Sequence, residues 1–123
     1  MNRPSHKELT RKLYAAGQAI RKGRVALLNQ LSLAADAMDL DYSIEIELEA
    51  VLVELLDETN PAHYTGSRPP QKSYEKDIRD LELFAFSVES SRFKCRIYFK
   101  FALAEEMFWL VSLHSDRPMK EES

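Results

Sequence analysis

Charged and aromatic side chains alternate with apolar ones along one segment near the C-terminal end of the chain. The apolar positions are Phe93, Cys95, Ile97, Phe99 and Phe101, and the positions between them hold Lys94, Arg96, Tyr98 and Lys100. Because successive side chains of a β-strand point to opposite faces, this pattern predicts a strand with one apolar and one polar face. The polar face then gathers a phenol and three cations.

A second apolar run, Met107 to His114, follows the polar pair Glu105-Glu106, and this order predicts a hairpin. Opposed residues of a hairpin that turns at this pair share a face, so Ser112 and His114 would project beside Tyr98. An imidazole and a hydroxyl would thereby join the phenol and the cations.

This combination suits cleavage of RNA by attack of a ribose 2′-OH on the adjacent phosphate, which needs a base, an acid and positive charge. His114 can fill either proton-transfer role near neutral pH. Tyr98 could donate to a phosphate oxygen, or take part in proton transfer if neighbouring cations lower its pKa. Arg96 and Lys100 would neutralise phosphates.

The same pattern also fits the solvated face of a half-buried antiparallel sheet with no catalytic role. Phe108 and Leu110 share the parity of His114, so part of that face must be covered. Cys95 is typical of a core position, and His6 and His63 of a surface. No spacing of His, Cys or carboxylate residues indicates a metal site.

The first half of the chain predicts helices that support this sheet. Ser5 and Glu8 form a capping box at the start of the first, and Gly17 or Gly23 ends it. A second helix is predicted over about 24–38, and its apolar stripe comprises Leu27, Leu31, Ala34 and Met38.

The segment from residue 42 to residue 57 fits either a strand or a helix. We favour a helix, because Glu and Leu dominate and because Glu45 and Glu47 complement its positive N-terminal end. The following loop, about 59–80, holds three prolines and a glycine, and it is either functional or a plain surface connection. A third strand is predicted from Leu81 to Val88, beside one strand of the hairpin.

These elements predict one α+β domain over 1–123, with N-terminal helices packed on a C-terminal antiparallel sheet. The helical half covers about 5–58, the loop about 59–80 and the sheet half about 81–116. Apolar runs are shorter than the roughly 20 residues of a membrane span. With a polar start and a single cysteine, Cys95, the sequence favours the cytoplasm.

Charge is segregated along the chain, although the formal net charge is only -3. Residues 3–24 are mainly basic, residues 36–58 carry only acidic charges, and residues 92–100 are basic again. Each basic segment can be a solvated face, or a patch that meets an acidic partner or RNA.

Several short motifs in order along the chain resemble the MqsR-like toxins, which are mRNA interferases with a RelE-like fold. In the N-terminal half these motifs are Ala16-Gly17-Gln18, Arg24-Val25-Ala26-Leu27-Leu28-Asn29 and Asp39-Leu40-Asp41-Tyr42. In the C-terminal half they are Ile97-Tyr98-Phe99-Lys100 and Leu110-Val111-Ser112-Leu113-His114.

The resemblance implies a toxin that cleaves mRNA without a metal or cofactor, arrests growth and is neutralised by a cognate antitoxin protein. It implies catalytic roles for Tyr98 and for His114, which stands where the family commonly has lysine. The family's earlier lysine falls near Tyr64, and Arg68 or Lys72 would replace it if the loop folds back, so Tyr64 and Arg68 are candidate RNA contacts. The alternative is a catalytically silent relative that binds proteins through its acidic middle helix or a hydrophobic sheet edge.

Overall fold

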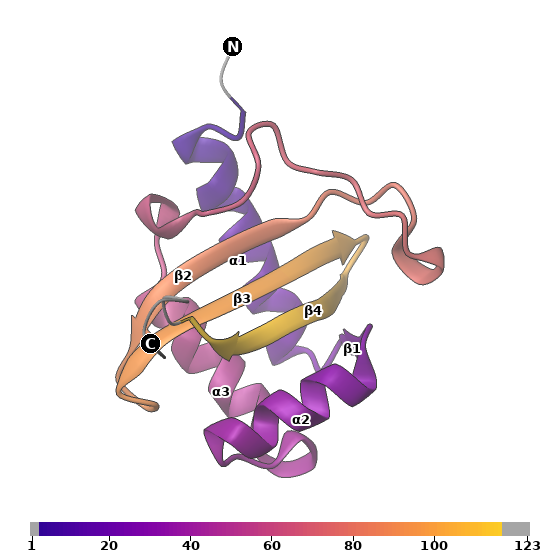
Figure 1. Ribbon diagram of the computed structural model, residues 1–123. Coiled ribbons are helices and arrows are strands. Elements are labelled where there is room, and N and C mark those ends of the chain that lie inside the picture. The colour runs from indigo at the N-terminus through magenta and orange to yellow at the C-terminus, as the bar shows by residue number, and fades with distance from the viewer. Residues whose placement is uncertain (1–2, 117–123) are drawn as a thin grey trace, which may run out of the picture.

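The computed structural model describes residues 3–116, and these form three α-helices and one four-stranded sheet (Figure 1). In chain order the elements are α1 (His6–Arg21), β1 (Val25–Leu27), α2 (Gln30–Leu40), α3 (Ile44–Glu58), β2 (Phe84–Ser90), β3 (Cys95–Ala104) and β4 (Met107–Ser115). Two 3₁₀ turns, Pro61–His63 and Lys76–Ile78, lie in the segment between α3 and β2. Residues 1–2 and 117–123 of the expected domain lie outside the described residues.

The strands are ordered β1-β4-β3-β2, with α1 and α3 behind the sheet in Figure 1. β2 pairs with β3 and β3 with β4 in antiparallel fashion, so the predicted hairpin and the predicted third strand are confirmed. The α+β class is confirmed as well. No helix within residues 3–116 is long and apolar enough to cross a membrane.

Aromatic side chains fill the space between the helices and the sheet. The five phenylalanines buried there are Phe84, Phe86, Phe99, Phe101 and Phe108. Their rings pack at centroid distances of 5.0 to 6.2 Å, as for Phe101 with Phe108 at 5.0 Å and Phe99 with Phe101 at 6.2 Å. Burial of each such ring contributes roughly 2–3 kcal/mol, so this layer is a substantial part of the core.

A cap explains why the ambiguous segment is a helix. The Ser43 side chain accepts a hydrogen bond from the Ile46 amide, and the Glu47 carboxylate accepts one from the Ser43 amide. Both bonds satisfy backbone donors at the helix start, one at the third helical residue and one at the N-cap itself. The predicted helix is therefore confirmed, and the strand-like alternation of this segment has no structural counterpart.

The prediction for residues 24–38 is wrong in two respects. Val25–Leu27 form β1, which runs parallel to β4, so the sheet is mixed and the helix begins only at Gln30. The predicted stripe does not face the core either, because Leu31 and Met38 are 89% and 81% exposed. Their place is taken by Leu33 and Ala37, both buried.

Gly17 lies inside α1, whereas Gly23 follows its end with φ 75°. Only the second of the two proposed glycines therefore terminates the helix.

The pairing of β3 with β4 shifts by one residue between Lys100 and Phe101, so the residues of β4 before the shift face the other way from the prediction. There, Leu110 lies opposite Phe101 and therefore faces the helices, as does Phe108. The expectation that Phe108 and Leu110 share the face of His114 is wrong, because one extra residue reverses the alternation. Past the shift, Val111 takes that face and forms a small second core with two other buried residues, Ile78 and Ala102.

Candidate functional site

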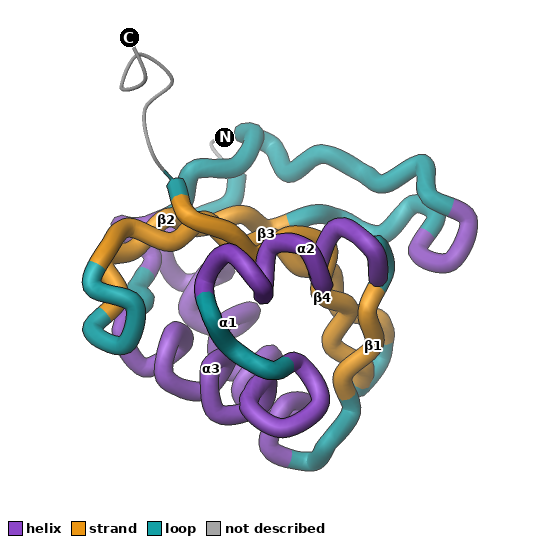
Figure 2. Tube along the Cα trace, turned by 60° about the horizontal axis from the view of Figure 1, so that its bottom comes forward, coloured by secondary structure: helices purple, strands orange, loops and turns teal. Residues whose placement is uncertain are grey.

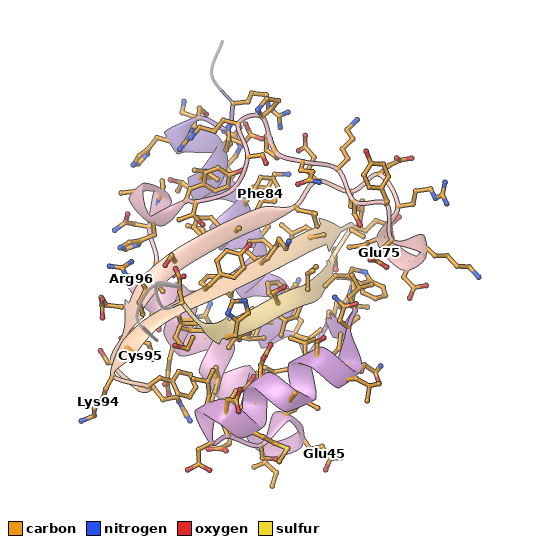
Figure 3. The ribbon with its side chains drawn as sticks, in the orientation of Figure 1. Glu45, Glu75, Phe84, Lys94, Cys95 and Arg96 are labelled. Atoms are coloured by element: carbon orange, nitrogen blue, oxygen red, sulfur yellow. The ribbon has the colours of Figure 1, made fainter. Side chains whose placement is uncertain are left out.

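Tyr98 and His114 lie directly opposite each other on β3 and β4. Their rings stack with centroids 5.1 Å apart and an interplanar angle of 27°. Lys100, two residues after Tyr98 on β3, lies on the same face and opposite Ser112, which is two residues before His114 on β4. The structure thus brings together the phenol, the imidazole, the amine and the hydroxyl that the alternation placed on one face. This face of the sheet is turned toward the viewer in Figure 3.

The His114 ring is oriented by its own backbone neighbour. Nδ1 lies 3.0 Å from the carbonyl oxygen of Ser115, a distance at which an Nδ1–H donates a hydrogen bond. This contact favours the tautomer that carries its proton on Nδ1. Nε2 of the neutral ring is then free to accept a proton.

The pKa of Tyr98 is shifted in the direction opposite to the one considered from the sequence. Burial raises the pKa of the phenol, and the nearby charge of Asp116 raises it further. The neighbouring cations therefore do not lower the pKa, and the phenol stays protonated at neutral pH. The Asp116 carboxylate is itself held by Ser87, whose hydroxyl donates to it.

Arg96 and Lys100 share this face but differ in the number of contacts that their charged groups make. The Arg96 guanidinium donates to the Ser87 carbonyl oxygen at 3.3 Å and pairs with Glu89 at 3.4 Å. Figure 3 labels it near the start of β3. The half-buried Lys100 makes no ion pair or side-chain hydrogen bond within residues 3–116, and its amine is available to a phosphate.

Lys100 borders two shallow pockets that the loop before β2 closes on one side. The first, of about 160 Å³, is lined by Thr65, Gly66, Ser67, Gln71, Leu83, Ala85, Tyr98 and Lys100. The second, of about 270 Å³, includes Lys72 and Ser112. Backbone hydrogen bonds from Thr65 to Ala85 and from Leu83 to Gln71 hold the loop against β2.

Gln71 and Thr65 are therefore site residues that sequence reasoning missed. Nothing in the loop's composition distinguishes them, because their position depends on hydrogen bonds to residues more than ten positions away. Lys72, considered as a replacement for the family lysine, does reach the pocket beside Lys100.

Tyr64 and Arg68 lie elsewhere. The Tyr64 ring is buried and packs edge-on against Phe86, which belongs to the core face of β2. Its hydroxyl donates to the Ser67 carbonyl oxygen. Arg68 lies over the Tyr64 ring at 5.0 Å and donates to the Pro4 carbonyl oxygen. The structure does not bring the Tyr64 side chain to the face of Tyr98 and His114, and both residues have structural contacts.

A larger pocket of about 760 Å³ adjoins His114 on the side away from Lys100. It lies between α2 and the ends of β3 and β4, and its lining comprises Asp36, Asp39, Leu40, Phe93, Cys95, His114 and Ser115. Cys95 is partly buried beside it, as a packing residue would be. Within residues 3–116 no group of three His, Cys, Asp or Glu side chains has the geometry to hold a metal ion.

The class that these observations define is a small α+β protein with three helices and a four-stranded, mostly antiparallel sheet. No protein-family model and no curated protein sequence matches the chain.

Proposed function

We propose that this protein is a metal-independent endoribonuclease of the MqsR-like, RelE-like kind, acting on mRNA in the cytoplasm as the toxin of a toxin–antitoxin pair. The observation that carries the proposal is the stacked pair of Tyr98 and His114 with the free amine of Lys100 two residues along β3. The sequence motifs that resemble the family include all three residues.

The chemistry follows from the protonation of the two rings. Nε2 of His114 takes the proton of a ribose 2′-OH, and the oxygen attacks the adjacent phosphorus. The bond from phosphorus to the 5′ oxygen breaks, which leaves a 2′,3′-cyclic phosphate on one fragment and a 5′-OH on the other. Tyr98, kept protonated by its raised pKa, gives its proton to the leaving 5′ oxygen. His114 then releases the proton that it took to solvent, and the Tyr98 phenolate regains one from solvent. Lys100 binds the phosphate and neutralises part of its charge, in the ground state as in the transition state.

The experiment is a cleavage assay with purified protein, freed of any partner, on end-labelled RNA in the presence of EDTA. We expect fragments that end in a 2′,3′-cyclic phosphate, and no cleavage of DNA of the same sequence, which has no 2′-OH. Absence of cleavage, or cleavage that requires a divalent metal, would contradict the proposal. The alternative, a catalytically silent protein-binding relative, predicts intact RNA and no growth arrest.

The partner of such a toxin is a cognate antitoxin encoded beside it. Expression of the chain alone should arrest growth, and co-expression with the adjacent gene should restore growth and give one complex on size-exclusion chromatography. Two separately eluting species together with unrelieved growth arrest would count against the toxin assignment.

A further inference from the structure

α2 carries a second apolar stripe on the side that faces away from the sheet. Leu31 and Met38, seven residues apart and so on one face of the helix, are 89% and 81% exposed. Ala34 and Ala35, also exposed, lie between them. The core contacts of α2 come from the opposite side, and Figure 2 shows α2 on the outside of the molecule, next to β4 and β1.

A third exposed aliphatic side chain, Ile46, follows in the first turn of α3 and is 84% exposed. Among residues 3–116, the other large apolar side chains with comparable exposure are Tyr14 and Tyr74, both tyrosines with a polar hydroxyl. The exposed aliphatic surface is thus concentrated on α2 and the start of α3. Concentration of this kind is typical of an interaction site.

The charges around this stripe are acidic and only partly neutralised. Glu47 and Glu54 pair with Arg92, and Asp57 lies 3.7 Å from Arg21. Within residues 3–116, four exposed carboxylates that lie within three residues of Met38 or Ile46 in the chain have no ion pair, namely Asp39, Asp41, Glu45 and Glu49. Figure 3 shows Glu45 projecting from the start of α3, below α2 in that view.

We propose that this stripe, Leu31 to Met38 with Ile46, is a docking site for a basic amphipathic helix of a partner protein. The stripe spans two helical turns, roughly 10 Å, which matches the ridge that a partner helix packs against. Lysine and arginine beside the partner's apolar stripe would pair with the unneutralised carboxylates. A second copy of this chain would oppose like charges, and RNA phosphates would be repelled, so both fit less well.

The proposal is independent of RNA cleavage, and its test uses the full-length protein. The probe is a fluorescent synthetic helical peptide with leucines at helical spacing and lysines elsewhere. One matched peptide has glutamate for every lysine, and another has the same composition in scrambled order. Fluorescence anisotropy should show the basic helical peptide binding at least tenfold more tightly than either matched peptide.

The double variant Leu31→Ser, Met38→Ser should weaken that binding at least tenfold, while its fold is kept because both side chains are exposed. Asp39→Asn with Glu45→Gln should reduce the salt dependence of binding. Tyr14→Ser and Tyr74→Ser serve as controls, since they remove exposed apolar surface elsewhere, and they should leave the affinity unchanged.

Equal binding of the three peptides, or unchanged binding by Leu31→Ser, Met38→Ser, would overturn the proposal. So would analytical ultracentrifugation that shows a dimer of the wild type and a monomer of this variant, because a second copy would then cover the stripe.

Discussion

Within residues 3–116 the amine of Lys100 has no ion pair, whereas the Arg96 guanidinium is engaged with Glu89. We predict that Lys100→Ala weakens RNA binding and lowers the slope of log K against log salt by about 1, through loss of one phosphate contact. The cleavage rate at saturating RNA should change little. Arg96→Ala should have a smaller effect, because its hydrogen bonds must be broken before it can reach a phosphate.

Fluorescence anisotropy at four salt concentrations measures this slope. Lys7→Ala, which removes an exposed cation from α1, is the matched control and should leave it unchanged. If Lys100→Ala lowers the saturated rate as much as loss of His114 does, the amine has a catalytic role that our account does not give it.

Two buried tyrosines provide a second comparison at the scale of single residues. Among the residues that the structure describes, the buried Tyr42 hydroxyl has no hydrogen-bond partner, whereas the Tyr64 hydroxyl donates to Ser67. Because an unsatisfied buried hydroxyl is costly, Tyr42→Phe should raise the free energy of unfolding by about 1 kcal/mol, and Tyr64→Phe should lower it by about the same amount. Urea denaturation measures both, and a loss of stability in Tyr42→Phe would show that its hydroxyl has a partner.

The pH dependence of stability tests the same tyrosine. Burial, with a contribution from Asp36, raises the pKa of Tyr42 from 10.0 to about 12. Between these values the unfolded chain has lost the proton that the folded chain keeps, so stability falls as pH rises from 10 to 12. Tyr42→Phe should lack this part of the alkaline loss.

At the scale of elements, segments with a periodic pattern of their own were predictable, whereas a segment that forms a strand only through a distant partner was not. α1, α3 and the β3–β4 hairpin follow from caps and alternation within each segment. β1 does not, because three residues form a strand only through pairing with β4, about 80 positions away. Once β1 takes Val25–Leu27, α2 starts later and buries Leu33 and Ala37, so the stripe predicted to be core lies outside.

The candidate site follows the same division. Tyr98 and His114 were predictable because strand alternation and a short turn determine which residues face each other. Gln71 was not predictable, since an irregular loop carries no periodicity. The register shift between Lys100 and Phe101 was not predictable either, because polar and apolar residues of β3 keep alternating through it. A bulge is detected by the change in partners, which only the paired strand reveals.

The two glycines in and after α1, Gly17 and Gly23, test this explanation of where the helix ends. Gly23 has a positive φ, so Gly23→Ala should lower the free energy of unfolding by about 1 kcal/mol. Gly17 lies inside α1, where an added Cβ would meet the far end of the long Arg21 side chain at 3.1 Å, and this end can shift. Gly17→Ala should therefore raise the free energy of unfolding by about 0.5–1 kcal/mol. Thermal denaturation of both variants measures these changes. If both substitutions raise, or both lower, the free energy of unfolding, the explanation of the helix end is wrong.

At the scale of the molecule, Arg3 joins the start of the chain to α1 and to the residues before β2. Its guanidinium pairs with Glu8 and Glu82, and these hydrogen bonds lower the pKa of both carboxyls from the usual 4.5. The stabilisation is present above that value and is lost as pH falls through the depressed pKa values. Arg3→Gln should therefore lose less stability than the wild type between pH 7 and pH 3.

Urea denaturation at the two pH values gives the difference for each protein. As a control, Arg92→Gln should also flatten the profile, because Arg92 lowers the pKa of Glu54 in the same way. An acid loss of equal size in Arg3→Gln and wild type would show that the pairs with Glu8 and Glu82 do not contribute.

The whole molecule thus presents a polar face on the sheet and an apolar, acidic face on α2. The first carries the proposed chemistry and the second the proposed partner. The two sites adjoin each other, because Asp39 of α2 and His114 of β4 line the same pocket. The variant Leu31→Ser, Met38→Ser still tests binding at α2 without removing a group of the RNA site.

The central claim is that Tyr98 and His114 act together on RNA, and the most direct measurement is the single-turnover cleavage rate of their variants in EDTA. Tyr98→Phe and His114→Ala should each lower the rate by about 100-fold or more, with an unchanged circular dichroism spectrum. The double variant should be no more active than the weaker single one. If the double variant cuts RNA as fast as the wild type, the proposed assignment of this face is wrong.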